Sequence, residues 1–167
     1  MKLKELLEQC SDVELTKEQV KQVKDYLGIK ETKKWRPKKD ESYFIINGKG
    51  EVDRILRACP EYSDHQFRVF TNNCFQTEEK AKFRLEQIKV YNELKNFADE
   101  NNKEIDWGNN LEKYYIYRAI STNELNISSL SNMQDLGQIY FSSYELAKQA
   151  IEKIGHERIR KYLFGVE

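Results

Sequence analysis

Two stretches of the chain, residues 75–88 (FQTEEKAKFRLEQI) and residues 141–154 (FSSYELAKQAIEKI), follow one pattern, F-x-S/T-x-E-x-A-K-x-x-L/I-E-x-I. The hydroxyl residue, Thr77 or Ser143, is in the position of a helix N-cap, where its oxygen accepts from free backbone N–H groups. The glutamate two positions later falls in the first turn, where the helix dipole favours a carboxylate. Each stretch therefore predicts the end of a strand followed by a helix.

The residues that would face a sheet are shared as well. An alanine in each helix lets it approach the sheet closely, and aliphatic residues then continue a buried stripe. These positions are Ala81, Leu85 and Ile88 in the first stretch and Ala147, Ile151 and Ile154 in the second. Because every shared residue has a role in folding, the pattern alone predicts a fold element and no activity.

The chain before each stretch repeats in the same order, which indicates an internal duplication. In the first copy, Trp35 precedes strands expected at 43–46, 52–56 and 66–70, with a hairpin turn at residues 47–50 (NGKG). In the second copy, Trp107 precedes strands expected at 114–117, 125–130 and 138–141.

These elements predict an α+β fold with an N-terminal helical hairpin and two tandem antiparallel strand–strand–strand–helix units, each sheet covered by a helix. The expected parts are a helical hairpin at 1–29, a basic linker at 30–41, a first unit at 35–101 and a second unit with a C-terminal helix at 102–167. The helix at 77–100 is longer than its counterpart in the second unit. We expect it to contact both units, with Leu94 and Phe97 extending its apolar stripe.

The charge of the chain is balanced, with 28 basic and 28 acidic side chains among 167 residues. A protein that binds nucleic acid without specificity usually has a basic excess, because phosphate contacts need Lys and Arg. A protein that mimics DNA needs the opposite excess. Any binding that depends on charge must therefore come from local patches.

Cysteine usage and hydropathy indicate a protein made and kept in the cytoplasm. Cys10, Cys59 and Cys74 are odd in number and far apart, which argues against a disulfide framework and against a zinc site. No apolar run approaches the roughly 18 residues of a membrane span, and the first residues lack the apolar stretch of a signal peptide.

No catalytic site is expected. His65 and His156 are the only histidines, and we expect His65 to be a solvated loop residue; a Cys–His pair with a nearby cysteine is the weaker alternative. The glycine-rich turn at 47–50 lacks the Gly-Lys-Ser/Thr of a phosphate-binding loop. The acidic connection at 99–106 is a weak candidate for a metal. The sequence therefore predicts neither cofactor nor metal, and binding is the favoured class of function.

The first strand of each unit has apolar or aromatic residues on both faces, so one face meets a helix while the other is covered or exposed for binding. The basic linker is either a solvated connector or a contact for phosphates or an acidic partner. Trp, Tyr and Arg dominate interface hot spots, which guides the choice of contact residues. The predicted partner-binding residues are Lys33, Lys34, Trp35, Arg36, Lys38, Lys39, Arg54, Arg57, Arg68, Tyr115 and Tyr117.

Residues 52–88, three expected strands and a helix that opens with Phe-x-Thr-x-Glu, are similar to small β-sheet modules that bind nucleic acid. These modules include the arm-binding domains of phage integrases and AP2-type domains, which lay their sheet in the DNA groove. The resemblance implies that Arg54, Arg57 and Arg68 would contact nucleic acid. The second unit departs from this pattern, because Arg118 is the only arginine on its strands.

The order of motifs over nearly the full chain resembles small phage and prophage proteins of low-GC Gram-positive bacteria. The residues that carry this resemblance are Trp35-Arg36-Pro37, Tyr43-Phe44-Ile45, residues 75–79, Trp107 before Tyr114-Tyr115-Ile116, and Phe141-Ser142-Ser143. It implies an accessory protein that binds a host protein or ribonucleoprotein in the bacterial cytoplasm and inhibits a defence complex such as a CRISPR–Cas nuclease. Nucleic-acid binding is the alternative, and neither a membrane nor a small-molecule substrate is expected.

Overall fold

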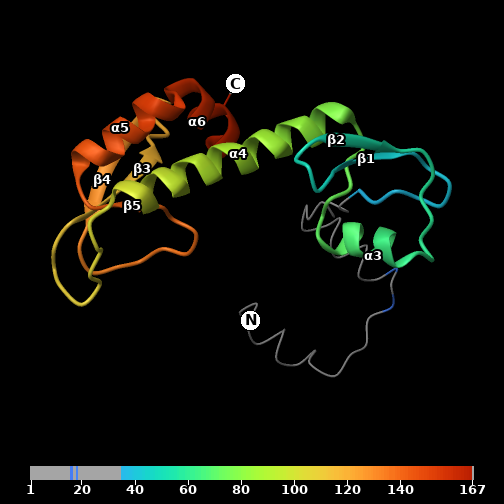
Figure 1. Cartoon of the computed structure of the whole chain (residues 1–167), viewed down its shortest axis with the longest axis horizontal. Coiled ribbons are helices and arrows are strands. Elements are labelled where there is room, and N and C mark those ends of the chain that lie inside the picture. Colours follow the sequence, from blue (N-terminus) through green and yellow to red (C-terminus); the bar gives the residue numbers. More distant parts are fainter. Residues whose placement is uncertain (1–15, 17, 19–34, 167) are drawn as a thin grey trace, which may run out of the picture. The chain divides into compact units, whose positions relative to one another are not determined.

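The computed structural model describes residues 16, 18 and 35–166 (Figure 1), and residues from Arg36 onward belong to one unit of the chain. The expected hairpin at 1–29, Cys10, Lys33 and Lys34 lie outside the described residues. The fold is mixed α and β, with two small antiparallel sheets. The elements in chain order are β1 (Tyr43–Ile46), β2 (Val52–Ile55), α3 (Ser63–Phe70), α4 (Glu78–Asn101), β3 (Lys113–Arg118), β4 (Leu125–Leu130), β5 (Tyr140–Phe141), α5 (Tyr144–Ile154) and α6 (His156–Phe164).

Strands β1 and β2 form the first sheet, in antiparallel register from Tyr43 opposite Ile55 to Ile46 opposite Val52. The hairpin turn between them was predicted correctly. The side-chain oxygen of Asn47 accepts from the backbone N–H of Lys49 at 2.8 Å and that of Glu51 at 3.0 Å, which closes the turn. Strand β2 ends at Ile55, one residue earlier than expected.

The strand expected at residues 66–70 was wrong, because these residues lie in helix α3. The helix ends where Asn72 takes a positive φ of 59°, which Asn tolerates better than most residues. Its single buried residue is His65, which contacts Tyr43 of β1. The contact between His65 and Tyr43 anchors the first turn of this helix on the sheet.

The missing third strand is replaced by one bridge and one side chain. Phe75 pairs with Phe44 through two backbone hydrogen bonds of 2.9 Å, in an isolated antiparallel bridge. The amide of Asn73 accepts from the backbone N–H of Ile46 at 2.8 Å and donates to its carbonyl at 2.7 Å. The outer edge of β1 is therefore satisfied without a full strand.

Helix α4 confirms the predicted cap, since the Thr77 hydroxyl accepts from the backbone N–H of Lys80 at 3.3 Å. It contacts β1 and β2 and also α5 and α6, so it joins the two halves as expected. The prediction that Leu85 and Ile88 belong to the buried stripe of this helix was wrong, because Leu85 is half-buried and Ile88 is exposed. The buried residues of α4 are Ala81, Val90, Leu94, Phe97 and Ala98.

The second sheet has the strand order β4-β3-β5, with both pairs antiparallel. Strand β4 has the predicted bounds, whereas β5 is shorter than the expected 138–141. Helix α5, capped by the Ser143 hydroxyl as predicted, contacts all three strands. Ile116 and Phe141 of the sheet join residues of α4, α5 and α6 in the main hydrophobic core.

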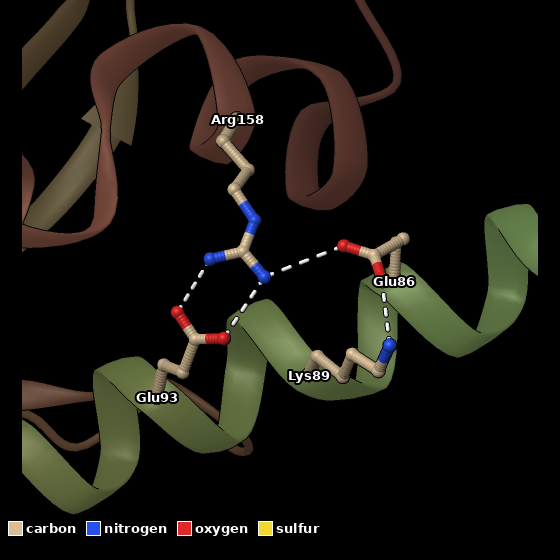
Figure 2. Close-up of polar contacts among 4 residues, drawn as sticks. All are labelled: Glu86, Lys89, Glu93 and Arg158. Atoms are coloured by element: carbon tan, nitrogen blue, oxygen red, sulfur yellow. Dashed lines mark hydrogen bonds and ion pairs between the residues drawn. The ribbon is translucent and has the colours of Figure 1, made fainter. Parts of the chain in front are cut away.

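Gly155 separates α5 from α6 with a φ of 101°, a conformation that residues with a Cβ rarely adopt. Helix α6 then lies beside α4, and ion pairs join the two helices (Figure 2). Arg158 of α6 donates to Glu93 at 2.5 and 2.9 Å and to Glu86 at 3.3 Å. Lys89 also pairs with Glu86, at 3.0 Å.

None of the helices within residues 35–166 has the length and apolarity needed to cross a bilayer.

Candidate functional site

The second sheet has two chemically different faces, which its register defines. Side chains of neighbouring strands that are directly opposite point to the same side of a sheet. The inner face includes Tyr114 and Ile116 of β3 and Leu125 and Ile127 of β4, which pack on the core beneath α5. The outer face consists of Lys113, Tyr115, Tyr117, Asn126, Ser128, Leu130 and Tyr140.

Aromatic rings gather on this outer face and on the loop before β3. The ring of Trp107 meets Tyr140 edge-on, with centroids 5.0 Å apart, and Tyr140 lies 6.2 Å from Tyr115. Tyr115 lies 6.1 Å from Tyr117, which completes the aromatic cluster of Trp107, Tyr115, Tyr117 and Tyr140. Trp107 is 37% exposed and Tyr117 is 38% exposed, so the cluster presents large rings to solvent.

Lys113 fixes one border of this cluster from within the protein. Only 2% of the residue is exposed, and its ammonium donates to the carbonyl of Asn109 at 2.9 Å and to that of Ser131 at 3.3 Å. The same ammonium lies 5.3 Å from the centroid of the Trp107 ring, a cation–π distance. One buried cation therefore holds the loop before β3, the chain after β4 and the Trp107 ring together.

Tyr140 is held at both its backbone and its hydroxyl. Its carbonyl accepts from the side chain of Asn102 at 2.8 Å, and its hydroxyl oxygen accepts from the backbone N–H of Asp135 at 2.8 Å. Tyr140 is only 7% exposed, so it supports the neighbouring rings from below. Because the supporting groups are already bonded, the exposed rings are ordered before any partner arrives.

The outer face carries almost no free charge. Of the strand residues on it, Lys113 alone is charged, and its ammonium is occupied by carbonyl oxygens. Arg118 belongs to the opposite face and donates to Asn123 at 2.8 Å. The polar groups that remain on the strands of this face are the Asn126 amide and the hydroxyls of Ser128 and the tyrosines.

The structure brings together some of the residues predicted for partner binding and separates others. Tyr115 and Tyr117 share the outer face, whereas Arg54 lies in the first sheet, exposed, and donates to Ser42 at 3.3 Å. Arg57 and Arg68 line one cavity. Of the described linker residues, Trp35 is half-buried and Arg36, Lys38 and Lys39 are exposed.

Trp107, Tyr140 and Lys113 were not predicted as site residues. The alternation of Lys113, Tyr115 and Tyr117 along one strand is a signal that could have placed Lys113 on the same face. Trp107 and Tyr140 come from a loop and a short strand, and their sequence positions give no sign that they meet.

The expectation of a solvated loop position for His65 was wrong. The residue lies in the first turn of α3, is 7% exposed, and its Nδ1 is 3.2 Å from the Tyr43 hydroxyl. The rings of His65 and Tyr43 also meet edge-on with centroids 5.6 Å apart. The contact with the first sheet explains why the helix buries this polar side chain.

Two observations bear on other kinds of site. Within residues 35–166, together with residues 16 and 18, no group of three or more His, Cys, Asp or Glu side chains is arranged to hold a metal ion. Cys59 and Cys74 are free and half-buried, and burial raises the pKa of the Cys74 thiol while the nearby Arg68 charge lowers it.

No protein-family model, no curated protein and no solved structure matches the chain.

Proposed function

We propose that the chain acts by stoichiometric binding to another protein, and that the outer face of the second sheet, bordered by Trp107, is the contact surface. The observation that carries this proposal is the aromatic cluster, in which two exposed rings, Trp107 and Tyr117, rest on a buried and fully bonded support of Tyr140 and Lys113. Rigid aromatic side chains supply contact area at a low cost in conformational entropy.

The composition of the surface supports a protein partner. Tyrosine, serine and asparagine predominate in surfaces selected to bind proteins, and Trp and Tyr are enriched at the residues that dominate affinity. A surface that stacks nucleotide bases also needs Lys or Arg heads for the phosphates. The strands of the outer face have no free cation, which favours a protein over a nucleic acid here.

The partner class rests on the resemblance to small phage and prophage proteins. In this proposal the chain is an accessory protein in the cytoplasm of a bacterial host. It inhibits a defence complex such as a CRISPR–Cas nuclease by covering part of its surface. Inhibition by covering a surface needs a contact area and no catalytic group, and the aromatic cluster supplies such an area.

A test compares two variants in defended bacteria. Tyr117→Ser removes an exposed ring of the cluster, and Tyr91→Ser removes a ring of similar exposure, 40%, from α4. We expect the wild type and Tyr91→Ser to restore phage growth and to recover a named defence component in a pull-down, and Tyr117→Ser to lose both. No protection by the wild type, together with no recovered defence component, would contradict the proposed partner.

A second candidate function is nucleic-acid binding by the first sheet and the basic linker. Arg57 and Arg68 line one cavity of the first half, and the described linker has three exposed cations, Arg36, Lys38 and Lys39. Gel shifts with DNA and RNA at low and high salt test it. Binding that weakens steeply with salt supports this function, and no binding at low salt excludes it.

We also infer that the two halves are diverged copies of one unit. The pairing of Phe44 with Phe75 in the first half matches the pairing of Tyr114 with Phe141 in the second. The N-caps occupy equivalent positions, and Ala81 and Ala147 are both fully buried. In this inference the first half reduced its third strand to the bridge at Phe75, with α3 preceding it, while the second half kept the strand β5 and acquired the aromatic cluster.

A further inference from the structure

A cavity of about 420 Å³ lies beside α3, and its chemistry differs from that of the aromatic cluster. This α3 cavity is lined by Tyr43 of β1, by Arg57 after β2, and by Asp64, His65 and Arg68 of α3. Its volume falls in the range of small-ligand pockets, roughly 300–1,000 Å³. Of its nine lining residues, Arg57 and Arg68 carry a positive charge and Asp64 a negative one.

A chain of hydrogen bonds connects three of the lining residues. Arg68 donates from Nη1 to the Tyr43 hydroxyl oxygen at 3.4 Å, and that hydroxyl is 3.2 Å from Nδ1 of His65. A guanidinium only donates, so the Tyr43 hydroxyl oxygen accepts from Arg68, and the same hydroxyl shares a second hydrogen bond with Nδ1 of His65. Within the part of the chain that the structure describes, Nε2 of His65 has no hydrogen-bond partner.

The charges around the cavity leave one guanidinium without a carboxylate. Arg57 pairs with Asp40 at 3.4 Å, but both side chains are more than half exposed, at 73% and 60%, so an anion can displace this pair at little cost. Arg68 has no ion pair with any residue between 35 and 166. Asp64 also lines the cavity, and its carboxylate opposes the charge of the two arginines.

We propose that the α3 cavity binds a phosphate group through the guanidinium groups of Arg57 and Arg68. Guanidinium groups match phosphate oxygens with paired donors. Cationic donors from separate segments suit a tetrahedral anion better than a neutral ligand. The phosphate comes either from a free nucleotide or inorganic phosphate, or from a nucleic-acid backbone. This inference does not rest on the protein-binding role of the outer face.

The experiment measures binding of three probes to the full chain by calorimetry and by amide NMR shifts. The probes are inorganic phosphate, adenosine 5′-monophosphate, and a short single-stranded DNA with hydroxyl ends. We expect at least one probe to bind saturably and to shift the signals of residues 63–68. Binding of the first two alone assigns the site to free phosphates, and binding of the DNA assigns it to a phosphodiester backbone.

Four variants locate the binding. Arg57→Met and Arg68→Met should each weaken it about tenfold, the effect of removing one charge-assisted hydrogen bond. Arg84→Met, at an exposed arginine of α4 outside the cavity, is the matched control and should leave it unchanged. Asp64→Asn should strengthen binding, because it removes the opposing charge. Since Arg57 is 73% exposed, its substitution tests the site even where Arg68→Met disturbs the fold.

The proposal is overturned by either of two results. One is no saturable binding of any probe to the wild-type chain at low salt. The other is equal affinity of the wild type and Arg57→Met for the probe that binds.

Discussion

Arg158 of α6 and Glu93 of α4, 65 positions apart, form a two-pronged ion pair, with N–O distances of 2.5 and 2.9 Å (Figure 2). The second nitrogen of this guanidinium also reaches Glu86 at 3.3 Å. The hydrogen bond to Glu93 raises the pKa of Arg158. Partial burial lowers this pKa, and the contact with Glu86 raises it further. One side chain therefore joins the last helix of the chain to the central one.

Replacing Arg158 by Met should lower the free energy of unfolding by about 1–2 kcal/mol, because two carboxylates of α4 lose a charge-assisted partner while the site stays partly solvated. Urea unfolding followed by circular dichroism measures the change. Lys148→Met is the matched control, since its pair with Glu152 is exposed and 4.0 Å long. We expect a change below about 0.5 kcal/mol for the control. Equal losses in both variants would contradict a specific role for Arg158.

The same cluster predicts a dependence of stability on pH. The Lys89 hydrogen bond, helped by Arg158, lowers the pKa of Glu86 below its ordinary value of 4.5 despite partial burial. The unfolded state therefore binds the proton more readily, so this stabilisation is present above the unfolded pKa and is lost as pH falls through the folded one. Wild type should exceed Glu86→Gln in stability at neutral pH, and the difference should shrink toward zero in acid. A constant difference at every pH contradicts the assignment.

The two N-caps should contribute similarly, as their geometry is alike. Thr77 accepts from Lys80 N at 3.3 Å and Ser143 accepts from Leu146 N at 3.2 Å. Thr77→Ala and Ser143→Ala should each cost about 1 kcal/mol of unfolding free energy. Ser121→Ala, in an exposed turn, is the control and should have almost no effect. Chemical denaturation of the four proteins side by side is the measurement.

Lys113→Met should destabilise the chain and loosen the aromatic cluster. The substitution leaves the carbonyls of Asn109 and Ser131 without their donor, which costs about 1–3 kcal/mol for each buried acceptor left unpaired. In a Trp35→Phe background Trp107 is the only tryptophan, so its fluorescence reports on the cluster. We expect a red shift and greater quenching by acrylamide. Unchanged Trp107 emission would show that Lys113 does not hold the ring.

Local features of the fold could be read from the sequence, because local chemistry decides them. The caps at Thr77 and Ser143 and the hairpin turn at residues 47–50 each depend on a few neighbouring residues. The strand expected at 66–70 failed for the opposite reason. There the conformation depends on the contact between His65 and Tyr43, 22 positions apart, and on an Asn73 side chain that takes the place of a strand backbone.

Local sequence patterns also predicted part of the candidate site. Tyr115 and Tyr117 follow from the alternation of one strand, which fixes a shared face. Trp107 and Tyr140 join them only through the fold, since a loop and a two-residue strand place their rings 5.0 Å apart. The burial of Lys113 depends on carbonyls on both sides of the hairpin, which no sequence pattern marks.

Helix α4 also bears on how the chain unfolds. Its N-terminal part contributes the fully buried Ala81, and its later turns contribute Val90, Leu94 and Phe97 to the main core. Because a helix loses its hydrogen bonds cooperatively, melting at one end weakens the other. We expect residues 36–166 to denature in a single transition, with amide protons of both sheets exchanging at the same rate through global opening. An excised second half must therefore keep α4, since Val90, Leu94 and Phe97 of this helix belong to its core.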